Sequence, residues 1–256
     1  MVKRYVRFEH ASGVAYGLLD GDRVRPINGD LFGEHEVASV SYACHEVQLL
    51  CPCEPSQLFA VGLNYRSHLG DRPTPKRPEI FYKPASCLQR PGGAVRIPAG
   101  ATDVHYEGEM VLIIGKRARS LTPEDARQAV FGVTCGNDVS ERQWQMGADQ
   151  DLQWWRAKGC DTFGPMGPSI AVGLDLNRLL LRTRLNGEVV QQQYTSDLLF
   201  DAGQIVSWIS QYVTLKPGDA IFTGTPGQTR AVKAGDVVEI ELEGVGVLRN
   251  PIEESA

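Results

Sequence analysis

The sequence predicts an α+β fold in which β-strands predominate. Short runs of alternating or continuously apolar residues, typical of strands, outnumber the segments with helical spacing along the 256-residue chain. The strands do not alternate regularly with helices, which argues against a doubly wound parallel sheet. Hydrophobic residues make up 42% of the chain, which is enough to form a sizeable core. We expect a small N-terminal module over residues 1–55 and a main domain over residues 56–256.

The N-terminal module is predicted to be rich in β-structure. Residues 5–8 alternate between outward and inward side chains, and residues 15–19 form a second strand-like run. Asp20-Gly21-Asp22 follows directly and predicts a hairpin turn. A short proline-containing linker, residues 51–55, then leads to the main domain.

The main domain begins with a predicted buried strand at residues 58–62, and its proline-rich segment 72–78 predicts an exposed loop that could act as a lid. Thr122 before Pro123 predicts a helix start, with the helix running through Val130. A second helix is predicted over residues 201–213 from its apolar spacing. Further strands are predicted at 80–83, 95–97, 110–114, 132–135, 169–172, 179–186, 189–192, 220–223, 237–242 and 246–248, with a hairpin turn at Asn186-Gly187.

Charge and composition narrow the function classes. The net charge of −5 and the absence of a long basic run argue against nucleic-acid binding. No apolar stretch is long enough for a signal peptide core or a membrane span, so we expect a cytoplasmic protein without a membrane partner. The six cysteines form no CxxC pair and are too sparse for a disulfide scaffold. We expect Cys51 and Cys53, the one close pair, to be inert reduced thiols.

Three acidic residues form the first candidate site. Glu107 and Glu109 precede an apolar run and would share one face of a strand, although such a pair alone is more typical of an exposed strand end. Asp138 follows another strand-like segment and could complete the site. Three oxygen ligands suit Mg²⁺ or Mn²⁺, and Ca²⁺ is possible. His105 raises a mixed histidine–carboxylate iron site as the alternative, but we expect it to support the site or the core instead.

Several motifs in this order resemble the fumarylacetoacetate hydrolase superfamily, in particular its short bacterial and mitochondrial members that act on acylpyruvates and 2-oxo diacids. The resemblance covers about residues 56–254. It is carried by Gly62-Leu-Asn-Tyr-Arg-Ser-His68, Phe81-Tyr-Lys-Pro84, His105-Tyr-Glu-Gly-Glu109 with Gly115-Lys116, Asn137-Asp138, Arg156-Ala-Lys-Gly159, Asn186-Gly-Glu188, Thr195-Ser-Asp197 and Thr223-Gly-Thr-Pro226.

The resemblance implies a β-roll-like mixed fold and a homodimer, with Mg²⁺ or Mn²⁺ on the acids that match Glu107, Glu109 and Asp138. It implies that Lys158 stabilises an enolate oxygen. Substrate contacts are implied or suggested for a further set of residues: Arg142, Gln145, Thr225, Lys83 and Tyr65.

His68 and Asp71 are the candidate general-base pair. They are three residues apart, so on a helical turn the carboxylate could orient the imidazole. Hydrolytic members of the superfamily have His and Glu at these positions, whereas the acid here is shorter by one methylene, and Gly70 weakens a helix between the two. A surface histidine beside a flexible loop is the other interpretation.

These features predict a divalent-metal-dependent enzyme with a small 2-oxo acid substrate. The leading hypothesis is hydrolysis of a carbon–carbon bond in a 2,4-dioxo acid of the acylpyruvate or fumarylpyruvate type, giving pyruvate and a second acid. The first alternative is decarboxylation or isomerisation of a 2-oxo diacid, of the oxaloacetate or 2-hydroxyhepta-2,4-dienedioate type. The second alternative is a protein of the same fold that binds a metal or small molecule without catalysis.

Overall fold

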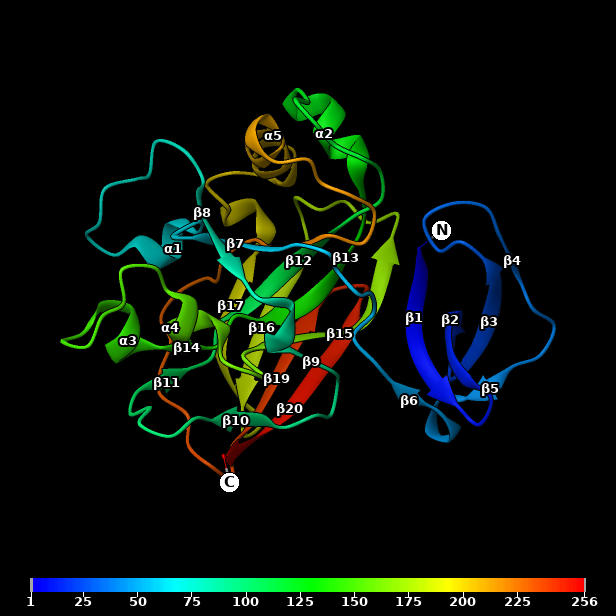
Figure 1. Ribbon diagram of the computed structural model, residues 1–256, viewed down its shortest axis with the longest axis horizontal. Helices are drawn as coiled ribbons and strands as arrows, with labels where there is room; N and C mark the ends of the chain where they lie inside the picture. The colour runs from blue at the N-terminus through cyan, green and yellow to red at the C-terminus, as the bar shows by residue number, and fades with distance from the viewer. Residues whose placement is uncertain (1, 256) are drawn as a thin grey trace.

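The computed structural model describes residues 2–255 and has the mostly β, α+β fold that the sequence predicts (Figure 1). Two sheets make up most of the molecule, one large and one of five strands, with a short two-stranded pair beside them. The strands of the large sheet are β1 Lys3–His10, β2 Gly13–Asp20, β3 Arg23–Gly29, β4 His35–Val37, β5 Tyr42–Ala43, β6 Gln48–Leu49, β7 Leu58–Gly62, β8 Glu79–Lys83, β9 Leu88–Gln89, β12 Gly108–Ile114, β13 Val130–Asn137, β15 Gly164–Val172 and β18 Ala220–Phe222.

The N-terminal strands continue the large sheet of the main domain. Its order is β4-β3-β2-β1-β15-β13-β12-β18-β7-β8, so β1 joins the two parts by pairing with β2 on one side and β15 on the other. The hairpin predicted at residues 20–22 is present between β2 and β3. Val6, Phe8 and Val24 form an apolar cluster of their own in this part. The division at residue 55 stays a prediction.

The centre of the large sheet is the most deeply buried part of the fold. All seven residues of β12 are buried, which agrees with its continuous apolar run Met110–Ile114. β12 pairs antiparallel with β13, with Glu109 opposite Gly136. This register places the first residues of β12 beside the last residues of β13.

The five-stranded sheet packs against the large one. Its order is β10-β20-β19-β16-β17, and β16 and β19 bury every second residue, so one face contributes to the shared core. The predicted turn Asn186-Gly187 connects β16 to β17. β20 extends further than the predicted 246–248. The strands are β10 Val95–Ile97, β16 Leu180–Leu185, β17 Glu188–Tyr194, β19 Val237–Leu242 and β20 Gly246–Glu254; the separate pair is β11 Val104–His105 and β14 Ser140–Glu141.

Two longer helices, α2 Pro123–Ala129 and α5 Ala202–Tyr212, lie side by side at one end of the molecule (Figure 1). The Thr122 hydroxyl accepts a hydrogen bond from the Asp125 amide, which is the predicted N-cap. Helix α2 ends one residue earlier than predicted, because Val130 already takes an extended conformation and begins β13.

Three short helices were not predicted: α1 Arg66–Leu69, α3 Arg142–Met146 and α4 Trp155–Gly159. They lie together at the side of the molecule opposite strands β1–β6 (Figure 1). Each is too short to show helical periodicity in the sequence. The proline-rich segment 72–78 has no helix or strand, as expected. Three 3₁₀ turns complete the elements: η1 Cys44–Glu46, η2 Ala85–Cys87 and η3 Thr195–Asp197. Among residues 2–255, no helix is both long and apolar enough to cross a membrane.

Candidate active site

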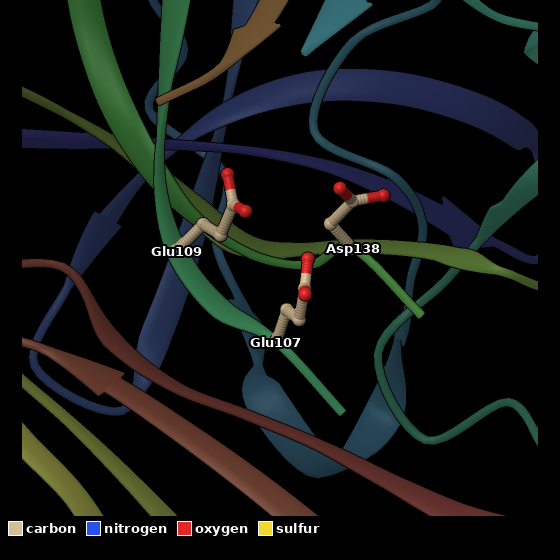
Figure 2. A group of neighbouring side chains, drawn as sticks. All are labelled: Glu107, Glu109 and Asp138. Carbon is tan, nitrogen blue, oxygen red and sulfur yellow. The ribbon is translucent and has the colours of Figure 1, made fainter. Parts of the chain in front are cut away.

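Three carboxylates from two adjacent strands point into one space (Figure 2). Glu109 lies in β12, Glu107 directly precedes that strand, and Asp138 directly follows β13. The Asp138 amide donates a 2.9 Å hydrogen bond to the Glu107 carbonyl, so the strand pairing continues to these residues. Residues opposite each other, and residues two apart in one strand, share a face of the sheet. One oxygen atom from each carboxylate therefore lies within 4.8 Å of the others.

Gly108 separates the two glutamates because a neighbouring strand approaches it closely. A Cβ at this position would collide with the Thr183 hydroxyl of β16. The Gly108 amide also donates to the Gln191 side chain of β17 at 3.2 Å. The five-stranded sheet thus packs directly on the strand end that carries the acids, and only glycine fits there.

Glu107 is held by two cationic side chains. Lys158 Nζ lies 2.6 Å from Glu107 Oε2, and Arg142 Nη2 lies 2.6 Å from Glu107 Oε1. Burial alone would disfavour the charged carboxylate, but the attraction of Lys158 and Arg142 outweighs it and holds the pKa of Glu107 well below its usual range. Glu107 is therefore ionised at physiological pH.

Asp138 is held by two lysines. Lys158 Nζ lies 2.7 Å from Asp138 Oδ2, and Lys83 Nζ lies 2.7 Å from Asp138 Oδ1. Burial lowers the pKa of the Lys83 ammonium, but the charge of Asp138 and its hydrogen bond outweigh this, so the pKa is raised. Lys83 also donates to the Lys158 and Phe163 carbonyls. Lys83 was expected to contact substrate, but it lies behind Asp138 and does not line the cavity described below.

Among residues 2–255, no lysine, arginine or histidine side chain forms an ion pair with Glu109. Its Oε2 accepts a 2.7 Å hydrogen bond from the Gly224 amide, and its side chain is buried beside the other two acids. Burial, then the charges of Asp138 and Glu107, raise the pKa of Glu109 well above its usual range. A cation bound by the three carboxylates would compensate for both effects. The donor set, three carboxylate oxygens, therefore fits a hard divalent cation.

The carboxylates line a small cavity of about 140 Å³. Lys158, Arg142, Gln145, Thr225 and His68 line it too, so it brings together most of the candidate residues. The rest of its wall is formed mainly by apolar side chains, and Arg72 and Gly62 also take part; the apolar set is Val61, Leu63, Phe81, Met146 and Trp154. A small cavity with a few converging polar groups is typical of a site for a small molecule.

Arg142 and Gln145 are three residues apart in helix α3 and share one of its faces. Arg142 Nη1 donates to Gln145 Oε1 at 2.6 Å. Arg142 Nη2 also donates to the Thr229 hydroxyl, which lies 2.9 Å from His105 Nδ1. His105 bonds to Asp103 through its other nitrogen and is not part of the carboxylate group. It therefore supports Arg142 through Thr229.

Thr225 is fixed between the two sheets. Its hydroxyl donates to the Gly108 carbonyl and accepts from Gln191 Nε2, both at 2.9 Å. Gln191 also donates to the Pro226 carbonyl. The Thr225 hydroxyl proton is thus already used within the protein. Gln191 was not predicted as a site residue. Nothing in the sequence of its strand indicates that its amide is buried beside the site.

His68 and Asp71 do not form a pair in this structure. His68 Nδ1 is bound to the Gly227 carbonyl, and His68 lines the cavity. Helix α1 ends at Leu69, and Gly70 turns the chain with a positive φ of 56°, so the helical turn expected to align the two side chains is interrupted. Asp71 is exposed; it lines an outer groove that His68 also borders, but it does not line the cavity.

Comparison with known proteins assigns the family. Residues 57–253 match the model of the fumarylacetoacetate (FAA) hydrolase C-terminal family. The chain belongs to this family. Residues 3–52 match a second model, Rv2993c-like, N-terminal. The superfamily inferred from the ordered motifs is therefore confirmed.

Two relatives of this fumarylacetoacetate hydrolase family member are similar over most of the chain, and the name of the second includes an activity. Protein Rv2993c of Mycobacterium tuberculosis is 40% identical over an alignment of 262 positions that covers 97% of each chain. The mitochondrial oxaloacetate tautomerase fahd2 of Xenopus laevis is 38% identical over 219 residues, covering 80% of this chain and 68% of the relative.

Two solved structures extend the comparison. A 2-hydroxyhepta-2,4-diene-1,7-dioate isomerase from Mycobacterium marinum has a TM-score of 0.92 and 38% identity over 99% of both chains. Maleylpyruvate hydrolase from Sphingobium sp. SYK-6, in complex with manganese(II) and pyruvate, has a TM-score of 0.83 and 28% identity, covering 99% of this chain and 100% of that one. Members of the family are thus enzymes, and one similar structure holds a divalent metal.

Two residues of the motifs that resemble the family, Tyr65 and Asp197, lie outside the cavity wall. Tyr65 is fully buried and does not line the cavity, although it was expected to. Burial, then the charge of Glu109, raise the pKa of Tyr65 above its usual range. Asp197 accepts a 3.0 Å hydrogen bond from the Ser67 amide and so anchors the helix that carries His68.

Of the residues in the cavity wall that were not predicted as site residues, Arg72, Met146 and Trp154 lie outside the strands. Arg72 belongs to the loop that follows His68, Met146 ends helix α3, and Trp154 precedes helix α4. Trp154 packs edge-on against Phe81, with the ring centroids 5.3 Å apart. All three belong to short helices or loops, where the sequence has no periodicity that assigns a face.

Proposed function

We propose that this protein is a divalent-cation-dependent isomerase or tautomerase that moves a proton on the carbon next to the keto group of a small 2-oxo acid. The observation that carries the proposal is the position of His68. Its imidazole lines the same cavity as the three carboxylates and is oriented by a backbone carbonyl, with no acidic partner among residues 2–255. Such a base suits proton transfer, the step that interconverts keto and enol forms.

The tautomer of His68 follows from its partner. A carbonyl oxygen only accepts hydrogen bonds, so Nδ1 of His68 must carry a proton in the contact with Gly227. In the neutral imidazole Nε2 then has a free lone pair and can take a proton from a substrate carbon.

The cation would be held by Glu107, Glu109 and Asp138. Mg²⁺ and Mn²⁺ suit three carboxylate oxygens, and the similar maleylpyruvate hydrolase structure contains manganese(II) together with pyruvate. Such an ion supplies Lewis-acid polarisation of the 2-oxo group and acidifies the neighbouring C–H bond.

The remaining side chains of the cavity bind and polarise the substrate. Lys158, buried beside two of the acids, donates hydrogen bonds to oxygens and would stabilise the negative charge of an enolate. Arg142 and Gln145 lie on one helical face and offer donors for the carboxylate next to the keto group. The Thr225 hydroxyl already has two partners, so its contribution to an anion would come from the main chain.

Hydrolysis of a 2,4-dioxo acid is the second candidate. It is supported by the similarity to a maleylpyruvate hydrolase and requires a base that activates water. The carboxylate expected to assist His68, that of Asp71, does not line the cavity, and His68 Nδ1 is bonded to the Gly227 carbonyl instead, which makes hydrolysis the weaker candidate. The 38% identity to an isomerase and to an oxaloacetate tautomerase further favours proton transfer over hydrolysis.

The experiment is to incubate the protein with Mg²⁺ or Mn²⁺ and follow three substrates by NMR in D₂O: oxaloacetate, 2-hydroxyhepta-2,4-diene-1,7-dioate and acetylpyruvate. Faster exchange of the C3 protons of oxaloacetate, or migration of the double bond, is the expected result. Pyruvate plus acetate from acetylpyruvate would instead establish hydrolysis, and pyruvate plus CO₂ from oxaloacetate would establish decarboxylation. No reaction of any 2-oxo acid would contradict the proposal and favour a binding protein.

A further inference from the structure

Arg72 lies where the small cavity opens into a wider surface groove. The cavity and the groove share four lining residues, His68, Arg72, Arg142 and Met146, whereas the three carboxylates line only the cavity. The shared residues therefore mark the mouth of the site. Arg72 itself is exposed, so its guanidinium is accessible from the groove.

The charge of Arg72 has no partner in the part of the chain that the structure describes. Of the lysine and arginine side chains that line the cavity, Lys158 and Arg142 are both bonded to Glu107. Among residues 2–255, Arg72 forms no ion pair and no side-chain hydrogen bond. A cation at the mouth with no acidic partner is available for an anionic group of a ligand.

The backbone of Arg72 is fixed relative to the base. Its amide donates a 3.1 Å hydrogen bond to the Leu69 carbonyl at the end of helix α1, and Pro73, which follows it, restricts the backbone of Arg72. The Ser67 amide of the same helix is anchored by Asp197. Arg72 is thus held close to His68 although its side chain is exposed.

We propose that Arg72 binds a second carboxylate at the far end of the substrate and selects 2-oxo dicarboxylic acids over 2-oxo monocarboxylic acids. The inference rests on the proposed function. The 2-oxo end belongs beside Glu107, Glu109 and Asp138, and His68 takes the proton from C3. Because His68 also borders the groove, the carbon beyond C3 extends towards the mouth, where Arg72 is the unpaired cation. A guanidinium can bind a carboxylate through two parallel hydrogen bonds.

The test compares two acids of equal chain length, oxaloacetate and 2-oxobutanoate, which differ only in the distal carboxylate. C3 proton exchange is measured with Mg²⁺ for wild type, Arg72→Gln and Arg72→Lys. The matched control is Arg77→Gln, which removes one exposed charge from the same loop at a residue that lines neither cavity nor groove. Calorimetric titration with the same acids and with oxalate, which has no distal group, measures binding independently of turnover.

Arg72→Gln should weaken oxaloacetate binding and raise its KM roughly 10- to 100-fold, the range for loss of a charged hydrogen bond. Values for 2-oxobutanoate and oxalate should stay near those of wild type, and Arg72→Lys should restore part of the preference. Equal effects on both acids, no effect, or the same effect from Arg77→Gln would overturn the role of Arg72. If wild type exchanges neither acid, the proposed function fails, while the binding titrations still decide whether Arg72 discriminates between them.

Discussion

The ammonium group of Lys83 lies 2.7 Å from Asp138 Oδ1, and both side chains are buried. Lys83 also donates to the carbonyls of Lys158 and Phe163. Lys83 thus holds both Asp138, a candidate cation ligand, and the backbone of Lys158, which would contact the substrate. Groups behind a metal ligand orient it and tune its affinity for the ion.

Replacing Lys83 by methionine should therefore reduce both stability and metal affinity. The change leaves Asp138 buried with one cationic partner fewer, and breaking a buried pair on one side costs about 3–5 kcal/mol. Thermal unfolding and Mn²⁺ titration followed by electron paramagnetic resonance measure the two effects. Lys76→Met, an exposed lysine on the loop 72–78, is the control and should change stability by less than about 0.5 kcal/mol. An unchanged Mn²⁺ affinity in Lys83→Met would contradict the positioning role.

Glu109→Gln should separate the stability of the metal-free protein from its ability to bind a cation. Burial and the charges of Asp138 and Glu107 disfavour the Glu109 carboxylate, so a neutral amide removes repulsion. The metal-free variant should be as stable as wild type or more stable by roughly 1 kcal/mol. Its Mg²⁺ or Mn²⁺ affinity should fall by more than about 100-fold. Losing a group that only supports a metal ligand costs up to about 100-fold in affinity, and losing a ligand itself should cost more. Thermal unfolding with EDTA, and then with added metal, gives both values. Loss of stability with EDTA would contradict the electrostatic argument.

Gln191→Ala should loosen the substrate site without touching the carboxylates. The amide of Gln191 holds the Thr225 hydroxyl and the Pro226 carbonyl and accepts from the Gly108 amide. Leaving these buried groups unpaired should cost about 1–3 kcal/mol and raise KM. Steady-state kinetics and denaturant unfolding provide the measurement. The adjacent Gln192, exposed on the same strand, is the matched control, and an equal effect of Gln192→Ala would rule out the proposed role.

The cysteines should be unreactive in the folded protein. Burial is the main cause that raises the pKa of the Cys51 and Cys135 thiols to about 12 and that of Cys87 to about 11, and the buried Cys53 shifts in the same direction. A neutral thiol is a poor nucleophile. Labelling with a thiol reagent at pH 8, followed by mass spectrometry, should modify Cys44 and Cys160 before these four. Rapid labelling of Cys51 or Cys53 in the native protein would disprove the expectation that the pair is inert.

The raised pKa values of the buried thiols should make the folded protein less stable at high pH. An unfolded thiol ionises near its ordinary pKa of 9.0, whereas the buried thiols stay protonated to a higher pH. Above pH 9 the unfolded state therefore binds fewer protons than the folded state, so these thiols make the free energy of unfolding fall as pH rises. Each contributes up to about 1.4 kcal/mol per pH unit in that window.

The convergence of the three acids could be anticipated from the sequence because strand geometry is local. Glu107 and Glu109 are two residues apart before an apolar run, and the period of a strand puts them on one face. The position of Lys83 could not, because its orientation towards Asp138 depends on the packing of β8 against a distant strand end. In its motif, Phe81-Tyr-Lys-Pro84, nothing distinguishes a lysine that faces the cavity from one that lies behind it.

The residues where the cavity opens into the groove could not be predicted from the sequence, for a different reason. Helix α3 and helix α4 have five residues each, so neither shows an apolar period. Arg72 stands in a loop with two other cations, Lys76 and Arg77, and only the fold shows which of the three borders the cavity. The spacing of His68 and Asp71 suggested a pair, but the positive φ of Gly70 separates them.

His68→Ala and Asp71→Asn should therefore differ in their effect on proton transfer. Removal of a positioned general base costs about 10²- to 10⁴-fold in rate, and His68 is the candidate base. Asp71 is exposed and has no hydrogen bond to the imidazole, so Asp71→Asn should keep C3 exchange of oxaloacetate within a few-fold of wild type. Both variants should bind Mn²⁺ normally, since neither residue belongs to the carboxylate group. If Asp71→Asn were as slow as His68→Ala, the loop would have to reorder over the substrate to bring the carboxylate to the imidazole, and the hydrolytic mechanism would regain its base pair.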